Sequence, residues 1–296
     1  MKEQRFDKRR KYYLVLDCET ATLPYANNFD SNAKQKIAIA KPLIYDIGWT
    51  IIDKKGNVYA RENYLISEIF SVPEVFNTAY YANKRPLYIE KLNKGEIVLT
   101  DWRTATRKLE FALSVTESVG AYNAMFDFKK AIPFTETYIN NLYSPNFYEW
   151  LEHQNRICDY ILENRPKENT KDFNPDTFEF RSNEYPLFDL WGLSCEYLLN
   201  NDEYKQMCLN FDWYTNSGKY FKTSAETTYR FITNNIEFDE MHTAIDDADI
   251  ESEIFALVVK KAKNKVDIGI SYFPFRKLGT VENFEIELAL RKKGER

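Results

Sequence analysis

The chain has 296 residues, with 45 acidic and 40 basic side chains and a net charge of −5 at neutral pH. This charge argues against a nucleic-acid binder held by general electrostatics, although a carboxylate-rich metal site would give the same sign without excluding a polyanionic substrate. The 44% of hydrophobic residues is ample for a core, and the length allows one large domain or two small ones.

The sequence gives no sign of membrane insertion or export. No apolar run approaches the ~18 residues that a membrane-spanning helix needs, and the basic N-terminus lacks the apolar segment of a signal peptide. The cysteines are far apart and show no C-x-x-C spacing, which argues against a disulfide framework or a zinc cluster. We therefore expect a cytoplasmic protein. The four cysteines are Cys18, Cys158, Cys195 and Cys208.

The first predicted element is a short buried strand over residues 12–16, which are aromatic and aliphatic. The stretch LVLDCETAT continues it and carries Asp17 and Glu19. Because side chains alternate along a strand, these two carboxylates point to one face and Cys18 points to the other. Two like charges at this position require a proton or a cation between them. The alternative is a solvated pair in a loop just after the strand.

Two more strands are predicted before the first helix. Residues 42–53 form an apolar run, residues 54–57 supply a hairpin turn, and residues 58–66 form the next strand. The polar segment 24–40, which precedes them, is expected to be a loop or a short helix. Three consecutive strands joined in this way are expected to be antiparallel neighbours.

The remainder of the chain alternates short strands with helices. Asp101 is placed to cap a helix through TDWRTATRKLEFALSV, in which small and apolar residues recur at helical spacing. This order indicates one α/β domain over residues 1–265, with helical insertions at 134–240, and a C-terminal extension over 266–296. Further elements are predicted at 119–123 (a strand), 125–131 (a helix that Pro133 ends), 188–200 (an apolar helix, or a strand leading into one) and 244–262 (an amphipathic helix).

A third carboxylate, Asp127, follows the strand predicted at 119–123. It lies in the first turn of a helix, where an aspartate often does no more than interact favourably with the helix dipole. This ordinary role and a role in a site are both compatible with the local sequence.

A fourth carboxylate, Asp247, heads the apolar stripe of the helix predicted at 244–262. It shares a helical face with Ile250 and Ile254, whereas Asp246 and Asp249 point elsewhere. A carboxylate on a buried stripe needs a partner, and no Lys or Arg lies three or four residues away to supply one. His242 precedes this helix and is expected in the loop before it, where a histidine is often incidental.

These separate signals become specific if the four carboxylates converge. Such a cluster is intolerable without cations, whereas two hard divalent cations about 3.5–4 Å apart would turn it into an oxygen-ligand cage of the kind that cleaves phosphodiesters. His242 at the edge of that cage could orient a water molecule or accept its proton. The four carboxylates are Asp17, Glu19, Asp127 and Asp247.

The order of these residues resembles a known family. D-x-E at 17–19, N-x-x-x-D at 123–127 and H-x-x-x-x-D at 242–247 are similar to the motifs of the DEDD-type 3′–5′ exonucleases of the histidine subclass. Members of this family are relatives of proofreading exonucleases with an RNase H-like fold, and the predicted strand meander matches its opening. The resemblance therefore implies an RNase H-like mixed sheet with flanking helices.

The resemblance also implies residue roles and an activity. Asp17, Glu19, Asp127 and Asp247 would hold two Mg²⁺ or Mn²⁺ ions, and His242 would be the general base. Substrate contacts would come from Thr20 at the 3′ end, Leu23 as a wedge against the terminal base, and Asn123 near the substrate backbone. The expected partner is the 3′ end of single-stranded DNA or RNA, from which nucleoside 5′-monophosphates would be released.

Several alternatives stay open at the level of sequence. Leu23 could instead pack in a loop, and nothing in the chain distinguishes the ribose 2′-OH, so an exoribonuclease or oligoribonuclease is the close alternative. A non-catalytic nucleic-acid-binding scaffold is another, although a decayed enzyme usually loses a ligand and here all five positions are present. A polymerase or other replication partner and the oligomeric state are left open. The long segments 24–40 and 134–240 depart from the family and leave substrate choice open.

Overall fold

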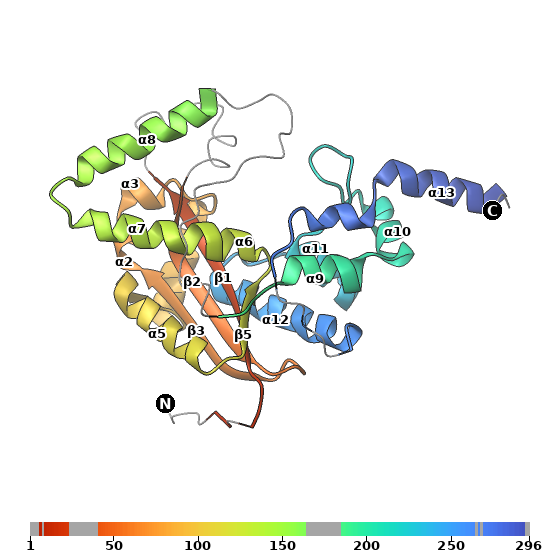
Figure 1. Ribbon diagram of the computed structural model, residues 1–296, viewed down its shortest axis with the longest axis horizontal. Helices are drawn as coiled ribbons and strands as arrows, with labels where there is room; N and C mark the ends of the chain where they lie inside the picture. The colour runs from red at the N-terminus through yellow and green to blue at the C-terminus, as the bar shows by residue number, and fades with distance from the viewer. Residues whose placement is uncertain are drawn as a thin grey trace.

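The structure is a computed structural model that describes residues 6–7, 9–23, 41–163, 185–263, 266 and 269–293 (Figure 1). The predicted polar segment 24–40 lies outside the described residues, as does part of the predicted insertion 134–240. The chain is α/β, with one mixed sheet flanked by helices.

Within the described residues, six strands form the sheet in the order β4-β3-β2-β1-β5-β6. The pairs β1–β2 and β2–β3 are antiparallel, which confirms the predicted meander, and the other three pairs are parallel. The order of β3, β2, β1, β5 and β6 is compatible with the RNase H-like fold, to which β4 adds an edge strand. The strands are β1 (Tyr13–Thr22), β2 (Pro42–Ile52), β3 (Val58–Ile66), β4 (Val98–Thr100), β5 (Ser118–Ala121) and β6 (Leu187–Asp189).

Strand β1 extends well beyond the run predicted for it, because β2 pairs with its whole length. Asp17 lies opposite Gly48 and Glu19 opposite Asp46, so both carboxylates lie within the strand and not in a loop after it. The register shifts directly after Glu19. Irregularities of this kind re-aim side chains and are common next to active sites.

The two faces of the sheet carry two hydrophobic cores. Leu14, Leu16 and Cys18 of β1 belong to the first core, together with residues of the helices α5 (Trp102–Ser114) and α7 (Ile132–Leu142). Tyr13 and Val15 belong to the second, together with residues of α9 (Leu190–Ser194) and α12 (Ala244–Lys261). This alternation confirms that Cys18 faces away from Asp17 and Glu19.

The helices divide between these faces, and α9, α10, α11 and α13 gather on one side of the molecule beyond β5 (Figure 1). The α-helices are α2 (Ser67–Phe70), α3 (Pro73–Phe76), α4 (Arg85–Lys94), α5 (Trp102–Ser114), α6 (Ala124–Phe126), α7 (Ile132–Leu142), α8 (Phe147–Glu163), α9 (Leu190–Ser194), α10 (Asp202–Phe211), α11 (Ala225–Thr233), α12 (Ala244–Lys261) and α13 (Val281–Lys293). Four other helical segments are η1 (Ala82–Lys84) and η4 (Pro274–Leu278), which are 3-10 helices, and η2 (Asp127–Ala131) and η3 (Cys195–Leu199), which are π-helices.

Most predicted helices form where the sequence places them. Asp101 caps α5 by accepting a hydrogen bond from the backbone N of Thr104 at 2.8 Å, as predicted. The apolar segment 188–200 is a strand leading into a helix, and α12 occupies nearly the whole of the range 244–262.

The predicted end of a helix at Pro133 is wrong. The chain passes from α6 through the π-helical segment η2 into α7, and Pro133 lies in the first turn of α7. A proline is tolerated in a first turn, where its missing N–H removes no intrahelical hydrogen bond. The change of hydrogen-bonding pattern at η2 lets the helical path continue past the proline.

The segment after α12 packs against the second core. The backbone N of Gly269 donates to the carbonyl of Leu187 at 2.8 Å. Leu278, Val281 and Phe284, from η4 and α13, are buried in that core. The division of the chain at residue 265 stays a prediction.

Gly48 lets the start of α12 lie directly on the sheet. A methyl group at this position would come within 2.5 Å of the backbone N of Ile245 and 2.7 Å of the carbonyl carbon of Ala244. Backbone atoms cannot move aside as a flexible side chain can, so we expect Gly48→Ala to lower the free energy of unfolding by about 1–3 kcal/mol. Urea denaturation measures this loss, and an unchanged midpoint would contradict the close approach.

Candidate active site

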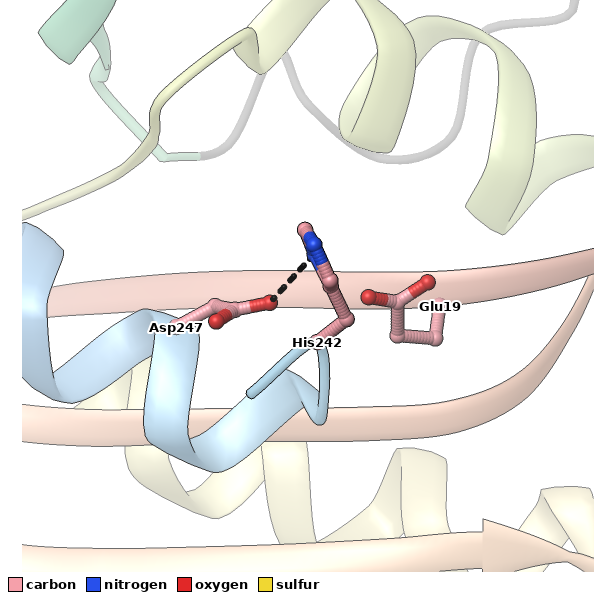
Figure 2. A group of neighbouring side chains, drawn as sticks. All are labelled: Glu19, His242 and Asp247. Atoms are coloured by element: carbon pink, nitrogen blue, oxygen red, sulfur yellow. Dashed lines mark ion pairs between the residues drawn. The ribbon is translucent and has the colours of Figure 1, made fainter. Parts of the chain in front are cut away.

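Three side chains from two distant parts of the sequence meet at the β1 side of α12. Glu19 comes from β1, His242 from the loop before α12, and Asp247 from the first turn of that helix (Figure 2). One ligand atom from each lies within 4.8 Å of the others, and the Nδ1 atom of His242 is 3.9 Å from an oxygen of Asp247. A carboxylate, a carboxylate and an imidazole at this spacing are a possible set of metal ligands.

The sheet fixes the start of α12 and therefore the position of Asp247. The buried side chain of Asp46 on β2 accepts a hydrogen bond from the backbone N of Ala244, the first residue of α12, at 2.9 Å. Asp247 is only 7% exposed, whereas its neighbour Asp246 turns away and pairs with Lys91 at 2.6 Å. These placements confirm the helical faces predicted for the two aspartates.

The loop that carries His242 is held by hydrogen bonds from the segment η1–α4. His242 has a φ angle of 50°, an uncommon conformation for a residue with a side chain. The hydroxyl of Tyr88 donates to the carbonyl of His242 at 3.1 Å, and the Nζ of Lys84 donates to the carbonyl of Met241 at 2.8 Å. Two anchors on adjacent carbonyls restrain this backbone and fix where the imidazole begins.

Asp17 and Asp127 are not part of that group of three ligands. Asp17 borders the group, and Asp127 is a neighbour of Asp17. Asp17 shares the face of Glu19 on β1, and its pKa is raised by burial and then by the charges of Asp127 and Glu240. Asp127 lies at the start of η2 beyond β5, is 3% exposed, and has the Cys18 side chain beside it. Asp17 therefore lies close enough to act on Glu19 and Asp247 of the group, and Asp127 lies close enough to act on Asp17.

Three buried carboxylate oxygens in and beside this region have no hydrogen-bond partner within the described part of the chain. They are the Oδ1 atoms of Asp127, Asp247 and Asp189, the last of which belongs to a carboxyl that acts on Asp127. A buried polar atom without a partner is costly, and a metal ion is one group that would satisfy it. The donor set of carboxylate oxygens also suits hard divalent cations, so the residues present fit Mg²⁺ or Mn²⁺.

The carboxylates of the cluster bind protons unusually strongly in the absence of cations. Burial raises the pKa of Asp127 to about 8 and that of Asp247 to about 9, and the charge of Asp17 adds to the effect on Asp247. Burial and then the charges of Asp17 and Asp247 likewise raise the pKa of Glu19 well above its ordinary value. Positive charge at this position would reverse these shifts.

The pKa of His242 is lowered, whereas those of the neighbouring carboxyls are raised. Burial, and then the positive charge of Lys84, lower its pKa to about 4. The imidazole is therefore neutral at physiological pH and able to accept a proton.

The three weaker candidates occupy different environments. Thr20 is half-buried on β1, directly after the register shift, and Asn123 is exposed at the N-terminus of α6. Leu23 is fully buried in the first core. Its burial favours the packing role that the sequence left open, and its proposed contact with a terminal base stays untested.

Three acidic residues near the site escaped the sequence analysis. Glu251 is 2% exposed on α12, and its Oε2 accepts a hydrogen bond from the backbone N of Tyr122 at 3.2 Å. Its position four residues after Asp247, on the same helical face, was a usable signal. Asp46 interrupts an apolar strand and could have been noticed, whereas nothing in the local pattern singles out Glu240.

Comparison with known proteins adds little to this geometry. No family model matches the chain, and no curated protein matches it. A solved structure described as "3'-end specific recognition of histone mRNA stem-loop by 3'-exonuclease" is matched over 88% of this chain and 85% of that chain, with 8% identity and a TM-score of 0.34. A likeness at this level carries no argument for the function of the present chain.

None of the helices that the structure describes combines the length and the apolar composition needed to cross a lipid bilayer.

Proposed function

We propose that this chain is a metal-dependent 3′–5′ exonuclease of the DEDD type, histidine subclass, which releases nucleoside 5′-monophosphates from the 3′ end of single-stranded DNA or RNA. The observation that carries the proposal is the meeting of Glu19, His242 and Asp247, with Asp17 beside them and Asp127 as a neighbour of Asp17. These five residues are the ones that the sequence motifs single out, and their types and order along the chain are those of the motifs.

The unusual electrostatics of the site support a divalent cation. Asp127 and Asp247 have raised pKa values and partnerless buried oxygens, an arrangement that disfavours the metal-free state. Asp17, Glu19, Asp127 and Asp247 would together hold two Mg²⁺ or Mn²⁺ ions. When bound, such ions supply an activated water and stabilise the charge that develops on the phosphate.

The protein's own contribution to the reaction is to position groups and to move a proton. His242, neutral and half-buried at the edge of the cluster, would accept a proton from the attacking water. Asn123, exposed at the N-terminus of α6, would contact the substrate backbone, and the half-buried Thr20 would contact its 3′ end. The anchored loop holds His242, and the tightly packed α12 holds Asp247, in fixed positions relative to Glu19 on β1.

Two alternatives make different predictions for the same protein. An exoribonuclease or oligoribonuclease would prefer RNA, and a non-catalytic scaffold would bind an oligonucleotide without shortening it. The retention of all five motif residues favours an enzyme over a scaffold. A specific observation that favours RNA over DNA is absent from the described residues.

The decisive experiment uses matched DNA and RNA oligonucleotides labelled at the 5′ end. We expect a ladder that shortens one nucleotide at a time in Mg²⁺ or Mn²⁺, because a 3′–5′ exonuclease leaves the 5′ label on every product. EDTA should abolish the ladder. Binding of both oligonucleotides without any shortening would overturn the enzymatic proposal in favour of the scaffold, and cleavage at internal positions would contradict exonuclease action.

A further inference from the structure

The ring of His242 has two neighbours that the exonuclease motifs do not include. Tyr81, which directly precedes η1, stacks on the imidazole with ring centroids 4.1 Å apart and an interplanar angle of 14°. Glu240, two residues before the histidine, places its Oε2 atom 3.7 Å from the Nδ1 of the imidazole. One neighbour covers a face of the ring and the other lies beside one of its nitrogens.

We propose that Tyr81 and Glu240 are positioning residues that fix the plane and the orientation of the His242 ring. This inference rests on the proposed function and deepens it, because it names what makes the imidazole ready for proton transfer. Neither residue touches the reacting atoms in this assignment, and each acts through His242.

The stack with Tyr81 restrains the ring plane. Aromatic rings in contact attract each other beyond what the area they bury contributes, which favours one orientation of the imidazole several-fold. The tyrosine is itself held, because the Nζ of Lys84 lies 5.1 Å from the centre of its ring and is tied to the carbonyl of Met241. Tyr81, Lys84 and the backbone of the histidine loop therefore form one connected unit.

Glu240 selects which nitrogen faces the reaction. Its side chain is only 12% exposed, and it lies on the Nδ1 side together with Asp247, whose oxygen is 3.9 Å away. If Asp247 is a metal ligand, Glu240 is the acidic neighbour of Nδ1 that is free to orient the ring. A carboxylate beside Nδ1 leaves Nε2 as the nitrogen that meets water and stabilises the imidazolium once it forms.

A spectroscopic test of the stack does not depend on nuclease activity. The chain has only two histidines, His153 and His242, so their ring signals can be assigned with a single His153→Ala variant. A tyrosine ring stacked on an imidazole shifts the carbon-bound ring protons of that imidazole upfield. We expect this upfield shift for His242 in the metal-free full-length protein, its loss in Tyr81→Ala and its retention in Tyr81→Phe. His153, which is exposed on α8, serves as the internal reference.

Kinetics then test the role. We expect Tyr81→Ala and Glu240→Gln to lower kcat about 10- to 100-fold with KM nearly unchanged, because a misplaced general base slows the chemical step, and Tyr81→Phe to restore most of the rate. Matched controls are Tyr143→Ala, a tyrosine that is 76% exposed after α7, and Glu237→Gln, an exposed residue of the same loop.

Other outcomes would overturn the inference separately from the proposed function. A raised KM with unchanged kcat in Tyr81→Ala would make the tyrosine a substrate contact, and a lowered KM with unchanged kcat in Glu240→Gln would make the glutamate a mere repulsive charge. The inference would also be overturned if the wild type is active and both variants have the same kcat and KM as the wild type. The same holds if the ring-proton shift of His242 is unchanged in Tyr81→Ala. An inactive wild type would instead overturn the proposed function, while the spectroscopic result still decides the stack.

Discussion

Asp17→Asn should abolish shortening of oligonucleotides while the protein stays folded and becomes more resistant to heat without metal. The substitution keeps the size of the side chain but removes an ionisable carboxyl whose pKa is raised, first by burial and then by the charges of Asp127 and Glu240. Loss of second-shell partners of metal ligands costs about 10- to 100-fold, so loss of a ligand itself should cost at least about 100-fold in kcat/KM. Folding of the wild type at neutral pH requires this buried carboxyl to take up a proton, and the amide does not, so the melting temperature should rise by about 2–4 °C.

The matched control for this prediction is Asp249→Asn. Asp249 lies on α12 but faces away from the cluster and pairs with Arg61 at 2.8 Å. Its substitution removes the same charge from the same region, so activity and metal response should be retained. Equal activity of Asp17→Asn and the wild type would show that the site has been assigned to the wrong residues.

The fold was predictable where local patterns and neighbours agree. The three strands of the meander, α5 with its Asp101 cap, and α12 were all predicted, because apolar periodicity and turn residues there specify both the element and its buried face. The length of β1 was not, since polar residues after position 16 look like a strand end. Pairing with β2 along the whole strand, a long-range contact, overrides that local signal.

In the candidate site, too, local patterns predicted some features, and long-range contacts determine the others. Spacing along one helix correctly separated Asp247 from Asp246, and strand alternation correctly put Asp17 and Glu19 on one face. No sequence pattern indicates that Tyr81 stacks on His242, because that contact depends on how η1 lies against the loop before α12. The catalytic roles of these residues stay predictions.

Without metal, the stability of the protein should fall as the pH rises from 6.5 to 8. In the folded state, burial raises the pKa of Asp127 to about 8 and that of Asp247 to about 9, so these groups keep protons that the unfolded chain has already lost. When the folded state binds more protons than the unfolded state, the free energy of unfolding decreases with rising pH. The lowered pKa of His242, about 4, has the opposite effect, but only below its ordinary value of 6.5, which sets the lower limit of this window.

Divalent cations should reverse this trend, because metal ligands must be deprotonated and binding becomes stronger as the pH rises. Melting temperatures measured in EDTA should therefore fall across the window, whereas those in Mg²⁺ or Mn²⁺ should stay level or rise, with a gap between the two series that widens toward pH 8. The double variant Asp127→Asn/Asp247→Asn has no carboxyl groups to titrate at these positions, so the metal response should be largely lost. The EDTA slope should become shallower without vanishing, because Asp17 and Glu19 also have raised pKa values. A wild-type melting temperature that is independent of pH in EDTA and unaffected by either metal would mean that the carboxylates do not share a site, since shared burial and repulsion are what hold their protons in the metal-free fold.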